Sequence, residues 1–277
     1  MNILSKFPAC FLITASLVIA STAAAHEYWI APENYRLESG DRIIADVIVG
    51  SDFSGDTYAY FPDNFHSFDV TDVNETRPIE GRIGDTPAID IETTSDGLHV
   101  LSQFSTTNKI TWSEFDKFDS FVRSHGMDWV LRAHAERGLP DTGFSEGYTR
   151  FVKSLVAVGD GAGADSYGGM FFELVANANP YTDDMSGGLP VTVLFQGEPL
   201  PNTQIHVFYR ADPAGSAVKS AVVADENGLA TIPNFGDGDY MINAVHMVIP
   251  FAADTERTGV VWHSLWASLT FQIGTNP

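Results

Sequence analysis

The sequence predicts a mainly β protein, in which a β-rich N-terminal domain with a helical insertion is followed by a C-terminal β-sandwich. Three observations predict this fold. The apolar runs are short and rich in Val, Ile and Phe, and 24 glycines and 14 prolines separate them. Several runs recur at a spacing of roughly ten residues. A hydrophobic fraction of 44% over 277 residues supplies a core for one large domain or two small ones, which excludes a disordered chain.

The first 25 residues have the pattern of a secretory signal peptide. Lys6 precedes an apolar run over residues 9–20, and small residues follow up to Ala25. We expect cleavage after Ala25, so that the mature protein begins at His26 and is periplasmic or secreted. The alternative is an uncleaved membrane anchor, but this apolar run is short for a span of about 20 residues.

Charge and cysteine content narrow the range of partners. The chain has 15 Lys and Arg against 36 Asp and Glu, which gives a formal net charge of −21. Phosphate backbones and anionic lipid heads repel such a chain, so we expect no nucleic-acid partner and no peripheral membrane binding. No segment after residue 25 has an apolar run long enough to cross a bilayer, so we also expect no membrane insertion after cleavage. Cys10, the only cysteine, lies in the signal segment. A transition metal would therefore be held by histidine, methionine, carboxylate or the chain terminus.

The N-terminal domain is placed at residues 26–180. Apolar runs at residues 42–49, 98–104 and 109–112 predict strands. The chain from about 51 to 97 is polar and rich in turns.

The helical insertion is predicted over about residues 113–157. Ser113 can cap a first helix, which Gly126 interrupts, and a second short helix stops before Gly138. Within residues 148–155 the apolar side chains recur at i, i+3, i+4 and i+7, so we expect a third helix there.

The C-terminal sandwich is placed at residues 189–277. Around it the sequence returns to short apolar runs, many with period-two alternation and bounded by Gly, Pro, Asn and Asp. Strands are predicted at residues 170–175, 191–195, 204–209, 220–224, 229–232, 238–246 and 265–273.

His26 is the first candidate metal ligand. Cleavage before it would give this one residue both an imidazole and a free α-amine, whose ordinary pKa of about 7.7–8.0 lets it release its proton to a metal. Together with a second histidine it would form a three-nitrogen site suited to Cu(II) or Ni(II). The alternative is that a histidine follows the cleavage point by chance.

His246 is the best candidate for the second histidine. It lies on a predicted strand and shares a face with Ala244 and Ile242, where a buried structural histidine is the alternative. His263 is a third candidate ligand, and Glu27 is an oxygen candidate for which a surface role is equally open. The cofactor expected from this set is a divalent transition metal, namely nickel, cobalt or copper.

Catalytic signatures are absent from the sequence. It contains no H-E-x-x-H zinc motif and no G-x-S-x-G nucleophile elbow. The glycine-rich segment 159–163 lacks the Lys-Ser/Thr that completes a phosphate loop. We therefore predict a binding protein, not an enzyme.

Five motifs in order resemble a bacterial secreted family known as a domain of unknown function and as the periplasmic component of nickel/cobalt transport systems. Its A-H-[DE]-x-W-[IL], E-x-Y-x-R-x-x-K-x-L, E-L-V…N-P-Y, A-V-H-M and W-A-S-L-T-F motifs are similar to residues 25–30, 146–155, 173–181, 244–247 and 266–271. The resemblance covers nearly all of residues 25–273.

The resemblance implies a protein that takes part in nickel or cobalt uptake, with a membrane metal transporter as a partner. It also implies that His26 and His246 are ligands, since both lie in the motifs. In place of an acidic D-W-E-S-x-W stretch this chain has V-W-H-S-L-W at residues 261–266, so His263 can replace a carboxylate there.

The C-terminal module also resembles carboxypeptidase-regulatory and transthyretin-like sandwiches. The turns at residues 197–202, 225–228 and 238–240 are similar to their G-x-P-L-x-x, D-x-x-G and G-x-Y turns. This likeness implies an immunoglobulin-like or transthyretin-like sandwich and, by itself, no function.

The expected function is periplasmic binding of a divalent transition metal in support of its import or homeostasis. Two alternatives stay open. One is a copper mono-oxygenase that uses the same histidine arrangement, and the other is a metal-free adhesion or scaffold module.

Overall fold

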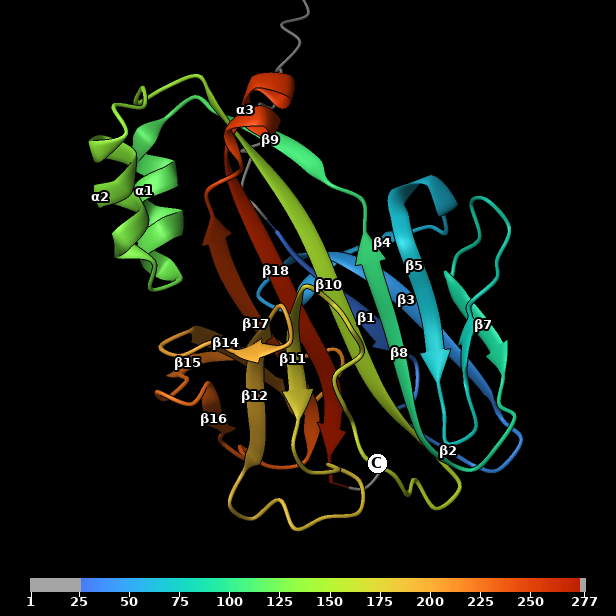
Figure 1. The fold of residues 1–277 in the computed structure, drawn as a ribbon. Coiled ribbons are helices and arrows are strands. Elements are labelled where there is room, and N and C mark those ends of the chain that lie inside the picture. The colour runs from blue at the N-terminus through green and yellow to red at the C-terminus, as the bar shows by residue number, and fades with distance from the viewer. Residues whose placement is uncertain (1–25, 275–277) are drawn as a thin grey trace, which may run out of the picture.

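The computed structural model describes residues 26–274 as a mainly β, sandwich-like molecule built from three sheets (Figure 1). This confirms the predicted fold class. The signal peptide predicted over residues 1–25, with Cys10 inside it, lies outside the described residues.

A ten-stranded sheet forms the centre of the molecule. Its two longest strands, β10 (Phe144–Val158) and β18 (Val260–Ile273), run parallel side by side. Since one comes from the predicted N-terminal domain and the other from the C-terminal sandwich, a single sheet runs through both. The other strands are β15 (Val218–Val223), β14 (Gln204–Arg210), β17 (Gly238–Val248), β8 (Gly97–Ser105), β5 (Phe65–Thr71), β6 (Thr76–Pro78), β2 (Arg36–Leu37) and β9 (Asn108–Trp112).

A second sheet covers one face of the central sheet, which we call the β1 face. Val152 and Val156 of β10 pack there against Ile30 and Ile43 in a continuous apolar core. The strands of this covering sheet are β1 (Glu27–Pro32), β3 (Arg42–Ser51), β4 (Ser54–Tyr58) and β7 (Ile89–Glu92).

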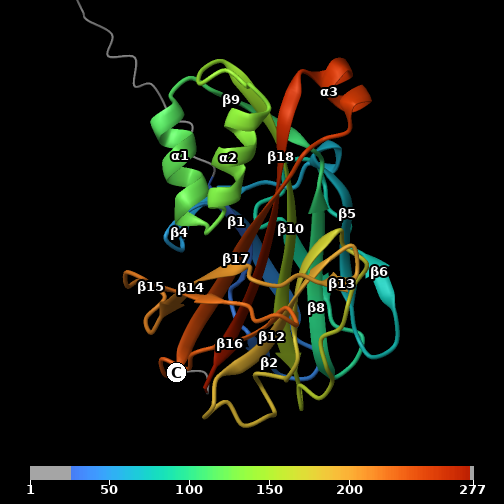
Figure 2. The same ribbon diagram turned by 60° about the vertical axis from the view of Figure 1, so that its left-hand side comes forward.

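A third sheet covers the opposite face, which we call the β12 face (Figure 2). Phe151 and Leu155 of β10 pack there with Val191 and Val193. Successive side chains of a strand point to opposite faces, so β10 contributes to both cores. The strands of this sheet are β11 (Phe172–Ala176), β12 (Leu189–Phe195), β13 (Glu198–Pro199) and β16 (Leu229–Ile232).

Helices cover the end of the β1 face that the second sheet leaves open. Phe118 of α1 (Phe115–Ser124) and Val130 of α2 (Asp128–Glu136) pack with Trp262 and Trp266 of β18. These two helices confirm the first two of the predicted insertion. The structure also has α3 (Ala252–Thr258) and a short 3-10 helix (Pro62–Asn64). None of the helices within residues 26–274 is both long and apolar enough to span a membrane.

The third predicted helix is wrong, because residues 148–155 belong to strand β10. Every residue from Phe151 to Val158 is buried. A strand covered on both faces has apolar side chains in succession instead of alternation. In such a run, the i, i+3, i+4 and i+7 positions are apolar whether or not the segment is helical. The helical insertion therefore ends with α2 at Glu136.

Candidate functional site

The position of His26 is fixed by the first strand, β1. This strand pairs with β3, with Glu27 opposite Gly50. Two hydroxyls of β18 also hold it: Ser268 donates to the carbonyl oxygen of Tyr28 and Thr270 to that of Ile30, each at 2.7 Å. The start of the described chain is thereby tied to the central sheet.

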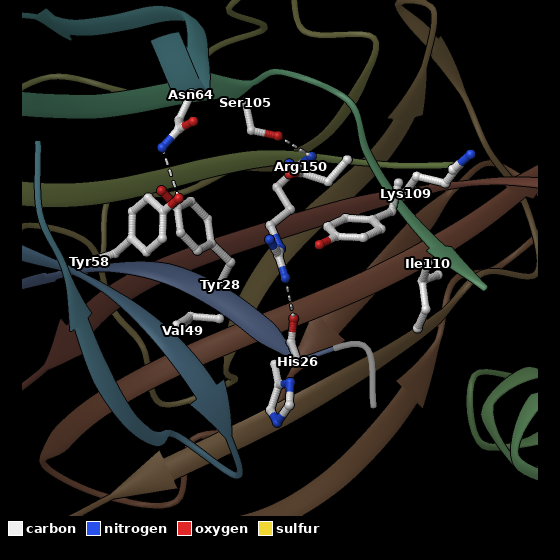
Figure 3. Close-up of a pocket in the computed structure, with 11 residues that line it drawn as sticks. His26, Tyr28, Val49, Tyr58, Asn64, Ser105, Lys109, Ile110 and Arg150 are labelled. Carbon is white, nitrogen blue, oxygen red and sulfur yellow. Dashed lines mark hydrogen bonds between the residues drawn. The ribbon is translucent and has the colours of Figure 1, made fainter. Parts of the chain in front are cut away.

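A cavity of about 340 Å³ opens beside His26 (Figure 3). It lies among the first residue of the described chain, β1, β3, β4, β9 and β10, and Lys109 stands exposed at its rim. Its lining includes the aromatic residues Tyr28, Tyr58 and Tyr148. None of the eleven residues that line the cavity is an aspartate or glutamate, although the chain has 36 of them.

Arg150 of β10 is the central cation of this cavity. Its Cζ lies 5.1 Å from the ring centroid of Tyr28 and 4.8 Å from that of Tyr148, and these contacts hold the guanidinium by cation–π attraction. Its Nη2 donates to the carbonyl oxygen of His26 at 3.2 Å. Figure 3 shows the side chain reaching from β10 to the backbone of His26.

The hydrogen bonds of Arg150 are incomplete. Its Nε is buried and has no hydrogen-bond partner among the described residues, and no carboxylate within residues 26–274 forms an ion pair with it. Burial lowers the pKa of its guanidinium, and the hydroxyls of Tyr148 and Tyr28 oppose that shift.

Neutral polar groups complete the cavity wall. The hydroxyl of Tyr28 donates to Oε1 of Gln103 at 2.7 Å, and burial raises the pKa of this tyrosine. Asn64 Nδ2 donates to the hydroxyl oxygen of Tyr58 at 2.8 Å. These bonds leave the hydroxyl proton of Tyr58 and the Nε–H of Arg150 without an acceptor among the described residues, so the cavity suits a ligand that accepts hydrogen bonds.

His246 lies on the β12 face, on the other side of the central sheet from His26. The structure confirms that it shares a strand face with Ala244 and Ile242, whose side chains belong to the core under the third sheet. The ring of His246 packs against Phe195 and Phe172, at centroid distances of 4.8 and 5.9 Å. Burial there lowers its pKa to about 4. The structure does not bring His26 and His246 together.

His263 also lies on the β12 face. Val248 pairs with His263 and His246 with Leu265, so the two histidines are diagonal neighbours across β17 and β18. Nε2 of His263 lies 2.8 Å from Oγ1 of Thr149. This ring nitrogen is therefore already engaged in a hydrogen bond. Burial lowers the pKa of His263.

Glu27 points away from the cavity. It lies next to His26 along β1, so its side chain projects to the opposite side of that strand. There it is buried, and desolvation raises its pKa against the opposing effect of nearby Lys219. Among residues 26–274 no three histidine or carboxylate side chains gather in a way that could hold a metal ion.

Arg150 and Tyr148 are cavity residues that were not among the predicted site residues, although both lie in the E-x-Y-x-R motif. Residues two apart share a face on a strand but not on a helix. The expectation of a helix over 148–155 therefore hid the fact that Tyr148 and Arg150 face one cavity. The signal that could have revealed them is the period-two spacing of Glu146, Tyr148 and Arg150.

The fold and the site define a class of protein: a mainly β, sandwich-like molecule with a small polar cavity at the start of its first strand. The chain belongs to the family described as a domain of unknown function (DUF4198), whose model matches residues 23–248. No curated protein matches the chain.

Among solved structures, the chain is similar to a crystal structure of a tetra-tandem repeat in the extending region of a large adhesion protein. The sequence identity is 12% and the TM-score is 0.23, over 91% of this chain and 50% of that one. The chain thus spans about half the length of that structure, and a score this low carries no argument about function.

Proposed function

We propose that the protein is an exported binding protein for a divalent transition metal, namely nickel, cobalt or copper, and that it holds the ion at His26. In this proposal the protein is periplasmic, carries the metal without chemical change and hands it to a membrane transporter. The observation that carries the proposal is the location of His26 at the edge of a cavity of about 340 Å³.

The chemistry of residue 26 supports the proposal. Removal of the preceding segment would release an α-amine on the same residue as the imidazole, and the two nitrogens form a chelate. The backbone bonds of β1 with β3 and the hydroxyl bonds from Ser268 and Thr270 fix the position of this chain start. A fixed donor pair loses less conformational entropy when it binds an ion.

The ligand set differs from the one expected from the sequence. His246 and His263 lie on the β12 face, and Glu27 projects away from the cavity. We therefore assign the ion to His26 alone among these four residues. The remaining coordination positions are left to water or to a ligand that arrives with the metal.

Native mass spectrometry of the protein titrated with Ni(II), Co(II), Cu(II) and Zn(II) tests the proposal. Three proteins are compared: one that begins at His26, one with a single extra residue before His26, and His246→Ala. The first and third should bind one ion equally. The second should bind at least about tenfold more weakly, because an amide nitrogen replaces the amine.

Equal binding by the first two proteins would remove the α-amine from the site. Loss of binding in His246→Ala, with the fold intact by circular dichroism, would return the metal to the β12 face. Peroxide consumption by a copper-loaded sample with a polysaccharide would indicate a mono-oxygenase. If none of the three proteins retains a metal ion, the metal-free adhesion or scaffold role is the remaining alternative.

A further inference from the structure

We infer that the cavity beside His26 binds a small carboxylate anion through Arg150, and that the cargo is a di- or tricarboxylate chelate of the metal. This inference rests on the proposed function and names the form in which the metal is bound. The observation behind it is a cation in a cavity without an acidic side chain, in a protein with a net charge of −21.

Arg150 lacks the carboxylate partner that several other arginines of the described chain have, and unlike Arg137, which also has a buried nitrogen without a partner, it lines the cavity. Arg42, Arg123 and Arg257 each form an ion pair with a carboxylate at 3.0 Å or less. Arg150 instead contacts two aromatic rings, the hydroxyl of Tyr148 and one carbonyl oxygen, and its buried Nε–H has no described acceptor. A buried N–H without an acceptor has given up its hydrogen bonds to water and gained none in return, which costs free energy. A carboxylate that accepts from this N–H would recover part of that free energy, so its binding at Arg150 is favoured.

The geometry of the cavity suits a carboxylate ligand. The rings of Tyr28 and Tyr148 hold the guanidinium in place, which leaves its planar edge for hydrogen bonds with carboxylate oxygens. Lys109 at the rim adds a second positive charge, and Asn108 also lines the cavity as a possible donor. A volume of about 340 Å³ lies at the lower end of the range for small-ligand pockets.

Electrostatics favour a chelate over either of its components. A bare divalent cation at His26 would lie beside the guanidinium, whose Nη2 is 3.2 Å from the His26 carbonyl oxygen, and the two positive charges repel. A free polycarboxylate is repelled by the acidic protein as a whole. In a chelate the carboxylates offset the charge of the metal, so both repulsions are reduced. The free carboxylate oxygens can then bind Arg150 while His26 completes the coordination of the metal.

The test uses the protein that begins at His26 and three probes: nickel chloride, citrate, and preformed nickel citrate. Native mass spectrometry should detect a ternary species of protein, nickel and citrate. Arg150→Gln should weaken binding of nickel citrate by at least about tenfold, since charged hydrogen bonds are lost. Binding of nickel alone should be unchanged or tighter in that variant. Arg42→Gln, at an exposed arginine remote from the cavity, is the matched control and should behave as wild type.

Thermal unfolding checks that Arg150→Gln is folded, and Lys109→Ala at the exposed rim gives an independent variant with a smaller expected loss of about twofold to fivefold. Equal retention of nickel citrate by wild type, Arg150→Gln and Lys109→Ala overturns the inference. If the protein binds nickel but never retains citrate with it, the inference is overturned too, while the proposed function stays intact. Citrate bound through Arg150 with no metal in any sample overturns both the chelate and the proposed metal function.

Discussion

Strand β10 places two cations on opposite faces of the central sheet, and they have opposite surroundings. On the β12 face, Lys153 lies 2.6 Å from Asp165 and 3.0 Å from Glu173, with all three side chains almost fully buried. On the β1 face, Arg150 has aromatic neighbours and a cavity but no described carboxylate. The first cation has its counter-ions within the chain and stabilises the fold. The second has no counter-ion within residues 26–274, and in our proposal it is available to a ligand.

The buried triad also shows how a loop is fixed to the sheet. Glu173 accepts hydrogen bonds from the backbone N–H groups of Gly168 and Met170, and Asp165 accepts one from Ala176. The segment between β10 and β11 is thus anchored to the central sheet through the ion pairs of Lys153 with Asp165 and Glu173. Among residues 26–274, Arg150 takes part in no comparable network of ionic bonds.

The largest expected effect comes from removing the cation of the triad. Lys153→Met would leave two buried carboxylates without a cation, and we expect the free energy of unfolding to fall by about 3–5 kcal/mol. Urea denaturation at neutral pH measures this change. Lys117→Met, which breaks an exposed ion pair with Glu114, is the matched control and should change stability by less than about 1 kcal/mol. A loss of similar size in both variants would contradict the structural role of the triad.

The next prediction concerns a third ionisable side chain of β10, the buried carboxyl group of Glu146. It accepts hydrogen bonds from Trp112 Nε1 and from the hydroxyl of Ser264, and burial raises its pKa from 4.5 to about 7. The folded protein therefore keeps a proton that the unfolded chain releases at lower pH. The stabilisation is present in full below about pH 4.5 and is lost as the pH rises to about 7, by about 3 kcal/mol.

Glu146→Gln should abolish this part of the pH dependence. Urea unfolding of the variant and of wild type between pH 4.5 and pH 8 should give curves that diverge as the pH rises, with the variant the more stable at pH 8. Glu198→Gln, at an exposed position on β13, should parallel wild type. Parallel curves for Glu146→Gln and wild type would contradict this prediction, because they would show that the pKa of Glu146 is not raised in the folded protein.

The smallest expected effect on stability belongs to Arg150. Arg150→Gln loses two cation–π contacts and the hydrogen bond to the carbonyl oxygen of His26, but it also removes a buried donor without a partner, so the free energy of unfolding should change by about 1 kcal/mol. The same urea measurement, beside Lys153→Met, makes the comparison quantitative. A loss as large as that of Lys153→Met would assign Arg150 to the structure and not to a ligand site.

Much of the fold could be predicted from the sequence because short apolar runs with Gly and Pro at their ends specify strands locally. The runs at 42–49, 191–195 and 204–209 all form strands as predicted. Strand β10 could not be recognised in the same way, because burial on both faces removes the alternation. Without a predicted strand, the sequence could not show that Arg150 and Lys153 lie on opposite faces of a sheet.

The candidate site was predictable only in part. Period-two alternation correctly placed His246 beside Ala244 on one face of its strand. Which sheet covers that face depends on the pairing of β18 with β10 and β17, and strand partners distant in sequence cannot be derived from local patterns. For this reason the sequence could suggest that His26 and His246 meet, whereas the structure places them on opposite faces.

The hydrogen bonds from Ser268 and Thr270 to β1 have a consequence for the order in which the protein folds. These bonds join residues 240 positions apart, so the first strand of the described chain is secured by a strand far from it in the sequence. Contacts of such long sequence separation form late and slowly. Before β18 is in place, β1 lacks both hydroxyl bonds, and its position rests on its pairing with β3 and on Arg150 of β10, which donates to the carbonyl oxygen of His26.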